Sequence, residues 1–376
     1  MSWVLGRSLL PHSSELGLRL ELDRVLKVAV RGGASDVLLK TGTLPRFRLN
    51  GDLVSLSDGQ EITTEIMTAW VEKILPPYLQ RRLQSAGDVD FAYQIATGHR
   101  FRVNLFRQRQ TFGMVLRVIH PAVKSLQELQ MSEAIIKLAK ERRGLVLVTG
   151  ATGSGKSTTL AAIVQQINNE RAAHIITIED PIEFNFRDAC STINQREIGS
   201  DSESFASAMR AALRQNPDVI LVGELRDQQT TETALMAAET GHLVLSTLHT
   251  VDAVETMARL LSYFPPTQHS VIRQMLASTL KAVVSQRLVV RSDGKGMVAA
   301  QEILLVNATA RELILKAESF SSLHAVIANG HDQHGMCSFD DSLLGLLARG
   351  EITCDEALTQ SSNRDNMLLR MSGVSS

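Results

Sequence analysis

The second half of the chain alternates short apolar runs with stretches of helical character. The runs are LVLVT (145–149), HIITIE (174–179), DVILVGE (218–224) and HLVLSTLH (242–249), followed by a strand pair near SQRLVV (285–290) and VAAQEILLV (298–306). Strands that are apolar throughout are typical of a parallel sheet covered by helices on both faces. We therefore predict an α/β fold from about residue 130 to 306, followed by a mostly helical, more polar C-terminal part.

Residues 20–120 show a different pattern, which predicts an independent α/β module. Apolar residues recur at helical spacing from Leu22 to Val30, and this helix is expected to end at the glycine pair that follows. The stretch PRFRLNGDLVSL (45–56) indicates two short strands joined at Asn50-Gly51, because Asn-Gly is a strong hairpin signal. A helix-rich piece at 63–85 and a strand-like segment at 99–119 complete the module.

The stretch HPAVKSLQEL (120–129) reads as a linker between the two patterns. We expect an N-terminal domain at residues 1–120, which includes the start of this linker. The second domain is expected at residues 121–376.

The strand-like segment of the first module alternates apolar and polar side chains, so that one face of its sheet is expected to be basic. The alternating residues are Phe101, Val103 and Leu105 against Arg100, Arg102 and Asn104, with Arg117 further along. One interpretation is a solvated sheet face with a few ion pairs. The alternative is a functional set of arginines.

The stretch VTGATGSGKSTTLAAI (148–163) has the spacing of a nucleotide-binding P-loop between a strand and a helix. Its glycines allow backbone N–H groups to point at phosphate oxygens, with Lys156 at the β- and γ-phosphates and Ser157 at a magnesium ion. We predict binding of ATP or GTP with Mg²⁺. The candidate nucleotide-binding residues are Gly150, Thr152, Gly153, Ser154, Gly155, Lys156, Ser157 and Thr158.

The amino-acid composition bears on whether the chain binds nucleic acid or inserts into a membrane. The chain has 39 Lys and Arg against 40 Asp and Glu, and 4% aromatic residues, which argues against a nucleic-acid helicase and against nucleic acid as a partner. Apolar stretches are far shorter than the roughly 20 residues that a membrane span requires. We therefore expect a cytoplasmic protein without direct membrane insertion.

Acidic residues follow predicted strands, where an open parallel sheet places its ligands, and two histidines lie at the two ends of one predicted strand. Glu183 is the candidate that activates water, and Glu224 is the candidate magnesium organiser. His249, at one end of its strand, is a candidate sensor of the γ-phosphate. His242, at the other end, is either a second functional histidine or a partner of a backbone carbonyl.

Four ordered stretches carry a family resemblance. GATGSGKST, TIEDPIEF, NPDVILVGELRD and AAETGHLVLSTLHT resemble the Walker A, Asp box, Walker B and His box of the type II/IV secretion ATPase superfamily. Within it, the chain resembles the type IV pilus retraction ATPases of the PilT/PilU family from about residue 20 to 350. GASD, RFRVN, NQREIG and GEIT belong to the same resemblance.

The resemblance implies a homo-hexameric ATPase motor that drives type IV pilus retraction and twitching motility. Each subunit would contain an N-terminal PAS-like domain and a RecA-like ATPase domain, with ATP near their interface. The implied partners are an inner-membrane pilus platform protein and a paralogous retraction ATPase, which would place the motor peripherally at the inner membrane. The alternatives are a secretion or conjugation ATPase of the same superfamily, and a nucleotide-gated scaffold whose hydrolysis is incidental.

The resemblance also assigns residues. It implies phosphate binding by Gly155, Lys156, Ser157 and Thr158, catalysis by Glu183, a Walker B acid at Glu224, coupling to conformational change by His242 and His249, and ATP contacts from Arg102 and Arg117. Where retraction motors carry AIRNLI, this chain has TARELI at Thr309–Ile314. We expect this segment to be either a docking surface that presents Leu313 and Ile314 or an ordinary amphipathic helix.

Overall fold

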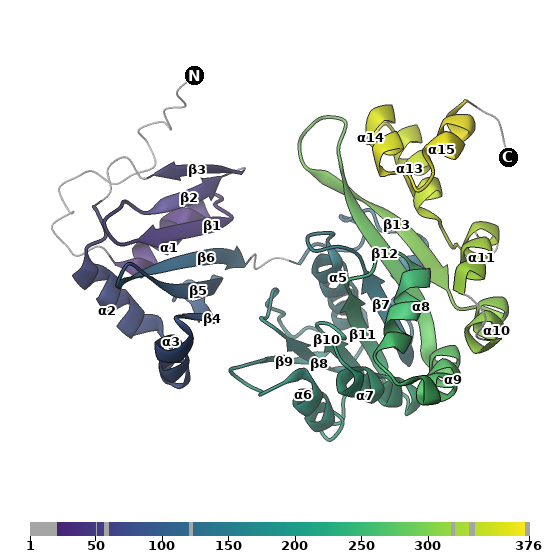
Figure 1. The fold of residues 1–376 in the computed structure, drawn as a ribbon, viewed down its shortest axis with the longest axis horizontal. Helices are drawn as coiled ribbons and strands as arrows, with labels where there is room; N and C mark the ends of the chain where they lie inside the picture. The colour runs from purple at the N-terminus through teal and green to yellow at the C-terminus, as the bar shows by residue number, and fades with distance from the viewer. Residues whose placement is uncertain are drawn as a thin grey trace. The chain divides into compact units, whose positions relative to one another are not determined.

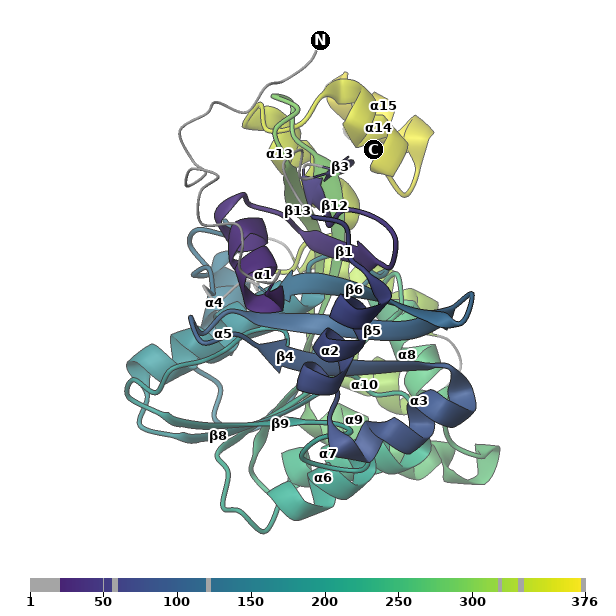
Figure 2. The same ribbon diagram turned by 90° about the vertical axis from the view of Figure 1, so that its left-hand side faces the viewer.

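The computed structural model describes residues 21–49, 51–55, 60–119, 123–316, 320–330 and 335–372. The chain forms two compact units, Met1–Pro121 and Ala122–Ser376, both shown in Figures 1 and 2. This division lies one residue from the boundary expected at 120. Among the described residues, no helix combines the length and the apolar character that a membrane crossing requires.

The N-terminal unit is built on a six-stranded antiparallel sheet with the strand order β3-β2-β1-β6-β5-β4 (Figure 1). Its strands are β1 (Asp36–Lys40), β2 (Arg46–Leu49), β3 (Asp52–Ser55), β4 (Asp88–Gln94), β5 (Arg100–Gln108) and β6 (Thr111–Ile119). Its helices are α1 (Leu22–Arg31), α2 (Thr64–Ile74), the 3-10 turn η2 (Pro77–Leu79) and α3 (Gln80–Ala86). The helices bury their apolar faces together with Phe101, Val103 and Leu105 of β5.

Two turns show how far the sequence predicts this unit. The hairpin expected at Asn50-Gly51 joins β2 to β3, with Gly51 at φ 94°, whereas Asn50 lies outside the described residues. The segment 99–119, predicted as one strand-like stretch, forms two strands that turn at Arg109 and Gln110. Both have positive φ, 43° and 62°. Such turns usually contain Asn or Gly, and neither occurs at these two positions, so no residue here predicts a turn.

The C-terminal unit contains a seven-stranded sheet with the order β13-β12-β7-β11-β10-β8-β9 (Figure 1). Its strands are β7 (Gly144–Thr149), β8 (His174–Glu179), β9 (Thr192–Glu197), β10 (Val219–Val222), β11 (Leu243–Leu248), β12 (Leu280–Val290) and β13 (Met297–Leu305). All neighbours are parallel except the antiparallel pair of β12 and β13. The predicted apolar strands are confirmed, and β9 is an additional, polar edge strand.

Helices cover both faces of this sheet. The helices and 3-10 turns of this unit are α4 (Glu133–Leu138), α5 (Lys156–Glu170), α6 (Phe205–Ala212), α7 (Gln228–Glu239), α8 (Ala253–Ser262), η3 (Pro266–Gln268), α9 (His269–Thr279), α10 (Ala308–Lys316), η4 (Phe320–Ser322), α11 (Leu323–Asn329), α13 (Phe339–Ala348), α14 (Cys354–Gln360) and α15 (Arg364–Met371). Val146 and Val148 of β7 share a core with α4 and α5, whereas Leu145 and Leu147 share one with α6 to α11. Helices α13 to α15 pack at the end of the β12–β13 pair (Figure 1).

Candidate nucleotide site

The P-loop stretch connects β7 to α5, as the sequence predicts. Gly150 has φ 144°, and a Cβ atom there would lie 2.4 Å from both Gln286 O and Ser154 Oγ, so no other residue fits. Gly155 has φ 89° and forms the N-cap of α5. The loop therefore directs the N-terminus of α5, with its free N–H groups, toward the carboxyl edge of the sheet.

Lys156 is the buried cation of this loop. Its side-chain Nζ donates to Gly150 O and Ala151 O, both at 2.8 Å, and the residue is only 7% exposed. Burial lowers the pKa of the Lys156 amine, and the negative charges of Glu183 and Glu224 offset part of this lowering. The lysine is thus held at the loop before any phosphate is present.

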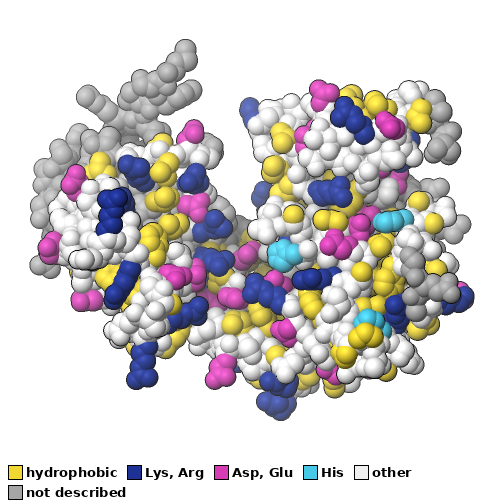
Figure 3. All heavy atoms as spheres, viewed as in Figure 1, with side chains coloured by type: hydrophobic (Ala, Val, Ile, Leu, Met, Phe, Trp, Pro, Cys, Tyr) yellow, Lys and Arg dark blue, Asp and Glu magenta, His cyan; other side chains and the backbone are white. Residues whose placement is uncertain are grey.

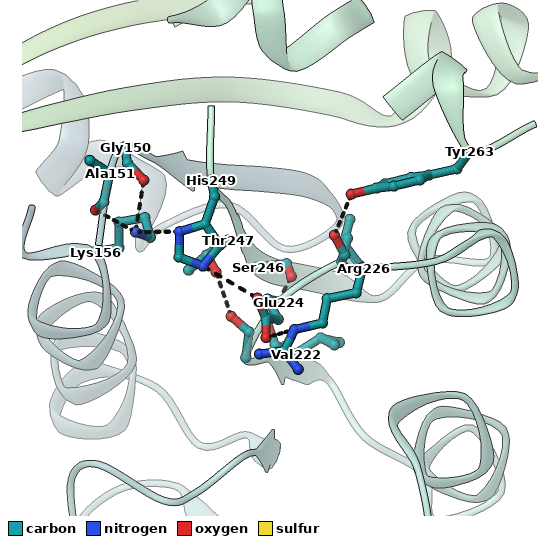
Figure 4. A network of polar contacts seen from close by, with 12 residues as sticks. Gly150, Ala151, Lys156, Val222, Glu224, Arg226, Ser246, Thr247, His249 and Tyr263 are labelled. Atoms are coloured by element: carbon teal, nitrogen blue, oxygen red, sulfur yellow. Dashed lines mark hydrogen bonds and ion pairs between the residues drawn. The ribbon is translucent and has the colours of Figure 1, made fainter. Parts of the chain in front are cut away.

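Glu224 and His249 follow neighbouring parallel strands, β10 and β11, and lie beside the loop. His249 Nε2 lies 3.4 Å from Glu224 Oε2, and its Nδ1 lies 3.5 Å from Lys156 Nζ. Glu224 also forms an ion pair with Arg226, a residue to which the sequence interpretation gave no role. Figure 4 shows His249 between Lys156 on one side and Glu224 with Arg226 on the other.

Neighbouring side chains fix the backbone on both sides of Glu224 (Figure 4). Thr247 Oγ1 donates to Gly223 O at 2.6 Å, and Tyr263 OH donates to Leu225 O at 2.9 Å. The short loop after β10 therefore has little freedom to move the carboxylate. Only the spatial neighbourhood reveals these two contacts, because Thr247 and Tyr263 are distant in sequence from Glu224.

Glu183 lies in the loop after β8 and is exposed. The buried Glu179, at the end of β8, accepts hydrogen bonds from Thr177 Oγ1 at 2.6 Å and from Glu183 N at 3.3 Å. Burial raises the pKa of Glu179 to about 7, although its hydrogen bonds, including one from Gln195, favour the ionised form. This second carboxyl beside the candidate base thus titrates near neutral pH.

The structure does not bring His242 to the phosphate-binding loop. His242 precedes β11, at the opposite end of the strand from His249, and its Nδ1 lies 2.9 Å from Ala237 O at the end of α7. A strand of six residues spans about 20 Å. Of the two interpretations of His242, the contact with a backbone carbonyl is the one observed.

Arg102 and Arg117 lie directly opposite each other on β5 and β6, on the polar face of the N-terminal sheet. Arg117 Nε donates to Asp36 Oδ1 at 3.0 Å, whereas Arg102 Nε lies 3.8 Å from Asp90 Oδ1. Both arginine side chains are exposed. Asp36 therefore orients Arg117, whereas the ion pair of Arg102 with Asp90, both in the described part of the chain, is longer.

Charged side chains of both signs are interspersed on the face of the described residues that Figure 3 shows. Neither unit presents a broad surface of one sign on this face. Such mixed charge does not resemble the basic stripe with which proteins bind nucleic-acid backbones.

The residues present fit a nucleotide with Mg²⁺. Ser154 Oγ is buried and has no hydrogen-bond partner within the described part of the chain, which leaves a donor free for a phosphate oxygen. Ser157, in the first turn of α5, and Glu224 carry oxygen ligands of the kind that Mg²⁺ prefers. Lys156 supplies positive charge at the same loop.

The model of the family described as "Type II/IV secretion system protein" matches residues 15–333. The chain belongs to this family. It is 42% identical over 323 residues to a twitching motility protein of Neisseria gonorrhoeae, covering 86% of both chains. It is 39% identical over 338 residues to the type IV pilus retraction ATPase PilT of Pseudomonas aeruginosa, covering 90% of this chain and 97% of the relative.

A solved structure of the pilus retraction motor PilT with bound ADP matches this member of the secretion family with a TM-score of 0.85. The sequences are 39% identical, and the match covers 92% of this chain and 98% of that one. The predicted fold class, with a PAS-like α/β domain followed by a RecA-like ATPase domain and a helical C-terminal part, is thereby confirmed.

The TARELI segment lies in α10, and part of the docking hypothesis for it is wrong. Ile314 is fully buried in the core, and Leu313 packs against that core. Arg311 Nε donates to Ala277 O at 2.9 Å, near the C-terminus of α9. Glu312 makes an exposed ion pair with Lys316. The segment therefore supports the fold through Arg311 and Ile314 and presents mainly its charged side to solvent.

We expect Arg311→Ala to lower the free energy of unfolding by about 0.5–1.5 kcal/mol, because it leaves a helix-terminal carbonyl without this donor. The matched variant Glu312→Ala removes only an exposed pair and should change stability by less than about 0.5 kcal/mol. Urea unfolding of the two purified variants tests this difference. If Arg311→Ala is as stable as the unchanged protein, Arg311 does not support the fold, and the docking hypothesis for this residue would stand.

Proposed function

We propose that this chain is an ATPase motor that uses ATP hydrolysis to drive type IV pilus retraction. The observation that carries the ATPase assignment is the convergence of Lys156, His249 and Glu224 beside the P-loop. The names of the similar proteins, a twitching motility protein and a pilus retraction motor with bound ADP, support the assignment to pili. The alternative, a secretion or conjugation ATPase, uses the same site and differs in its docking surfaces.

The proposed assembly is a homo-hexamer at the cytoplasmic face of the inner membrane. An inner-membrane platform protein and a paralogous retraction ATPase are the proposed partners. Molar mass measured by light scattering, with and without nucleotide, tests the oligomeric state. A mass of about 41 kDa under both conditions would contradict the hexamer, since this is the mass of one chain.

Each residue of the site has a proposed part in the reaction. The loop from Gly150 to Gly155, with Thr152, Gly153 and Ser154, binds phosphate oxygens together with Thr158. Lys156 exchanges its contacts with two loop carbonyls for the β- and γ-phosphates.

Ser157 and Glu224 are proposed to hold Mg²⁺, which neutralises charge on the phosphate oxygens when bound. Glu183 accepts a proton from the attacking water. His249 already lies within 3.5 Å of Lys156 Nζ and of Glu224, so a change at either residue alters its contacts. We propose that it reports the state of the γ-phosphate in this way. His242 lies at the opposite end of β11 from the phosphate-binding loop, so any part that it has in coupling would not involve direct contact with that loop.

Phosphate release by the purified chain tests the ATPase assignment. We expect steady release from ATP that requires Mg²⁺. Absence of release under these conditions, with nucleotide still bound, would favour the nucleotide-gated scaffold.

Arg102 and Arg117 are proposed to supply positive charge to the transition state, as arginine fingers do. Such fingers accelerate hydrolysis by about 10³–10⁵-fold, whereas an exposed ion pair contributes only about 0–1 kcal/mol. We expect Arg102→Ala and Arg117→Ala each to lower kcat at least about tenfold, allowing for partial compensation between them.

Arg48→Ala is the matched control, because Arg48 Nε also faces Asp36, at 4.0 Å, on the same sheet. It should retain nearly normal turnover. Turnover of both test variants within twofold of the unchanged protein would make the arginine strand a solvated sheet face.

A further inference from the structure

The edge strand β9, which the sequence did not predict, contains the first four residues of the stretch NQREIG (194–199). In the sequence this stretch belonged to the family resemblance and had no role. β9 pairs in parallel with β8, so that Gln195 lies opposite Thr177 and Glu197 lies opposite Glu179. Its side chains therefore reach the loop that leaves β8 and carries Glu183.

Gln195 binds this loop on the C-terminal side of Glu183. Its Nε2 donates to Phe184 O at 2.8 Å, and its Oε1 accepts from Phe186 N at 2.9 Å. One amide group thus satisfies a main-chain acceptor and a main-chain donor two residues apart. A shift of the loop would break both hydrogen bonds together.

Glu197 binds the loop on the N-terminal side of Glu183. Its Oε2 accepts from Ile182 N at 3.1 Å, and both Glu197 and Ile182 are buried, each 4% exposed. The strand backbone at this point is itself fixed, because Glu197 N donates to Asp201 Oδ2 at 2.8 Å. Glu197, which we call the second anchor of the loop, after Gln195 as the first, is therefore both buried and held in place.

The loop depends on such side chains. Within the described residues, the main-chain groups of 180–186 make no recorded hydrogen bond to another main-chain group. Glu183 N is held by Glu179, while the carboxylate of Glu183 has no recorded hydrogen bond or ion pair among these residues. The backbone on its two sides consequently sets the position from which the Glu183 side chain extends.

We propose that Gln195 and Glu197 are positioning residues for ATP hydrolysis, which hold the loop on both sides of Glu183 and thereby place its side chain for the reaction. This inference rests on the proposed role of Glu183 in activating water. A reacting group that is misplaced by about 1 Å can lose about 100-fold in rate, so the anchors are expected to affect kcat. They should affect ATP binding little, because the hydrogen bonds described above join them to the loop after β8.

Gln195→Met tests the first anchor, since methionine keeps the length of the side chain and removes both hydrogen bonds to the loop, together with the one that Gln195 Nε2 donates to Glu179 Oε1 at 3.3 Å. We expect kcat to fall by about 10- to 100-fold, with KM for ATP changed less than about threefold. Asn194→Leu is the control, because Asn194 lies on the same strand and contacts His174 instead of the loop. It should retain kcat within twofold.

Glu197→Gln and Glu197→Met test the second anchor as a pair. The glutamine keeps an acceptor for Ile182 N and is expected to retain more of the wild-type kcat than the methionine, which has none. Thermal melting of every variant identifies any that fail to fold. If the Glu197 variants fail to fold, Gln195→Met still tests the positioning role.

The decisive comparison places Gln195→Met in a Glu183→Gln background. If Gln195 acts through Glu183, it should cause no further loss of kcat there. An equal loss in both backgrounds, or a Gln195→Met kcat within twofold of normal, would overturn the positioning role. Normal turnover of Glu183→Gln alone would instead overturn the proposed role of Glu183, which distinguishes the two failures.

Discussion

Replacement of Lys156 by alanine is expected to lower kcat for ATP hydrolysis by about 10²–10³-fold, the loss typical when one donor to developing negative charge is removed. The structure holds the Lys156 ammonium at the loop through Gly150 O and Ala151 O, where phosphate oxygens would replace these carbonyls. A hydrogen bond from a charged group contributes about 1.5–3 kcal/mol, so ATP affinity should fall by about 10- to 150-fold.

Phosphate release and calorimetric titration with a non-hydrolysable ATP analogue measure the two effects of this substitution. Lys295→Ala is the control, because Lys295 is an exposed lysine in the turn between β12 and β13. It should leave both values unchanged. Wild-type turnover by Lys156→Ala would refute the assignment of the P-loop.

Glu183→Gln is expected to bind ATP almost normally and to lose about 10²–10⁴-fold in kcat. The amide keeps the size of the side chain and cannot accept the proton of the attacking water. Because Glu183 is exposed and its carboxylate makes no hydrogen bond or ion pair with another described residue, the substitution should leave the thermal stability nearly unchanged.

Single-turnover kinetics with saturating ATP measure this loss separately from binding. Glu203→Gln, at another exposed carboxylate, controls for the loss of one negative charge. Loss of ATP binding together with turnover in Glu183→Gln would show that Glu183 supports the structure of the site instead of the proton transfer.

The fold of the C-terminal unit is predictable because its buried strands are apolar throughout. Buried strands such as 219–222 have no polar face, and this predicts a parallel sheet with helices on both faces. The strand β9 escaped prediction for the opposite reason. Its residues TINQRE are polar, because an edge strand needs little apolar surface and its side chains here bind a loop.

The phosphate-binding part of the site is also predictable, since glycine spacing and Lys156 follow one another in the chain. The other residues of the site come from separate segments, and which of them lie together depends on the order and direction of the strands in the sheet. His242 and His249 have equivalent positions in the sequence pattern, at the two ends of one strand, and only the direction of β11 separates them. Likewise, helical spacing alone did not show that Ile314 faces the core.

Pilus retraction is tested most directly by deleting the gene for this chain in its own host and counting surface pili while scoring twitching motility. We predict more pili per cell and loss of twitching, both restored by the unchanged gene and neither restored by Lys156→Ala. Unchanged pilus number and twitching after deletion, or full rescue by Lys156→Ala, would contradict an ATP-driven retraction motor.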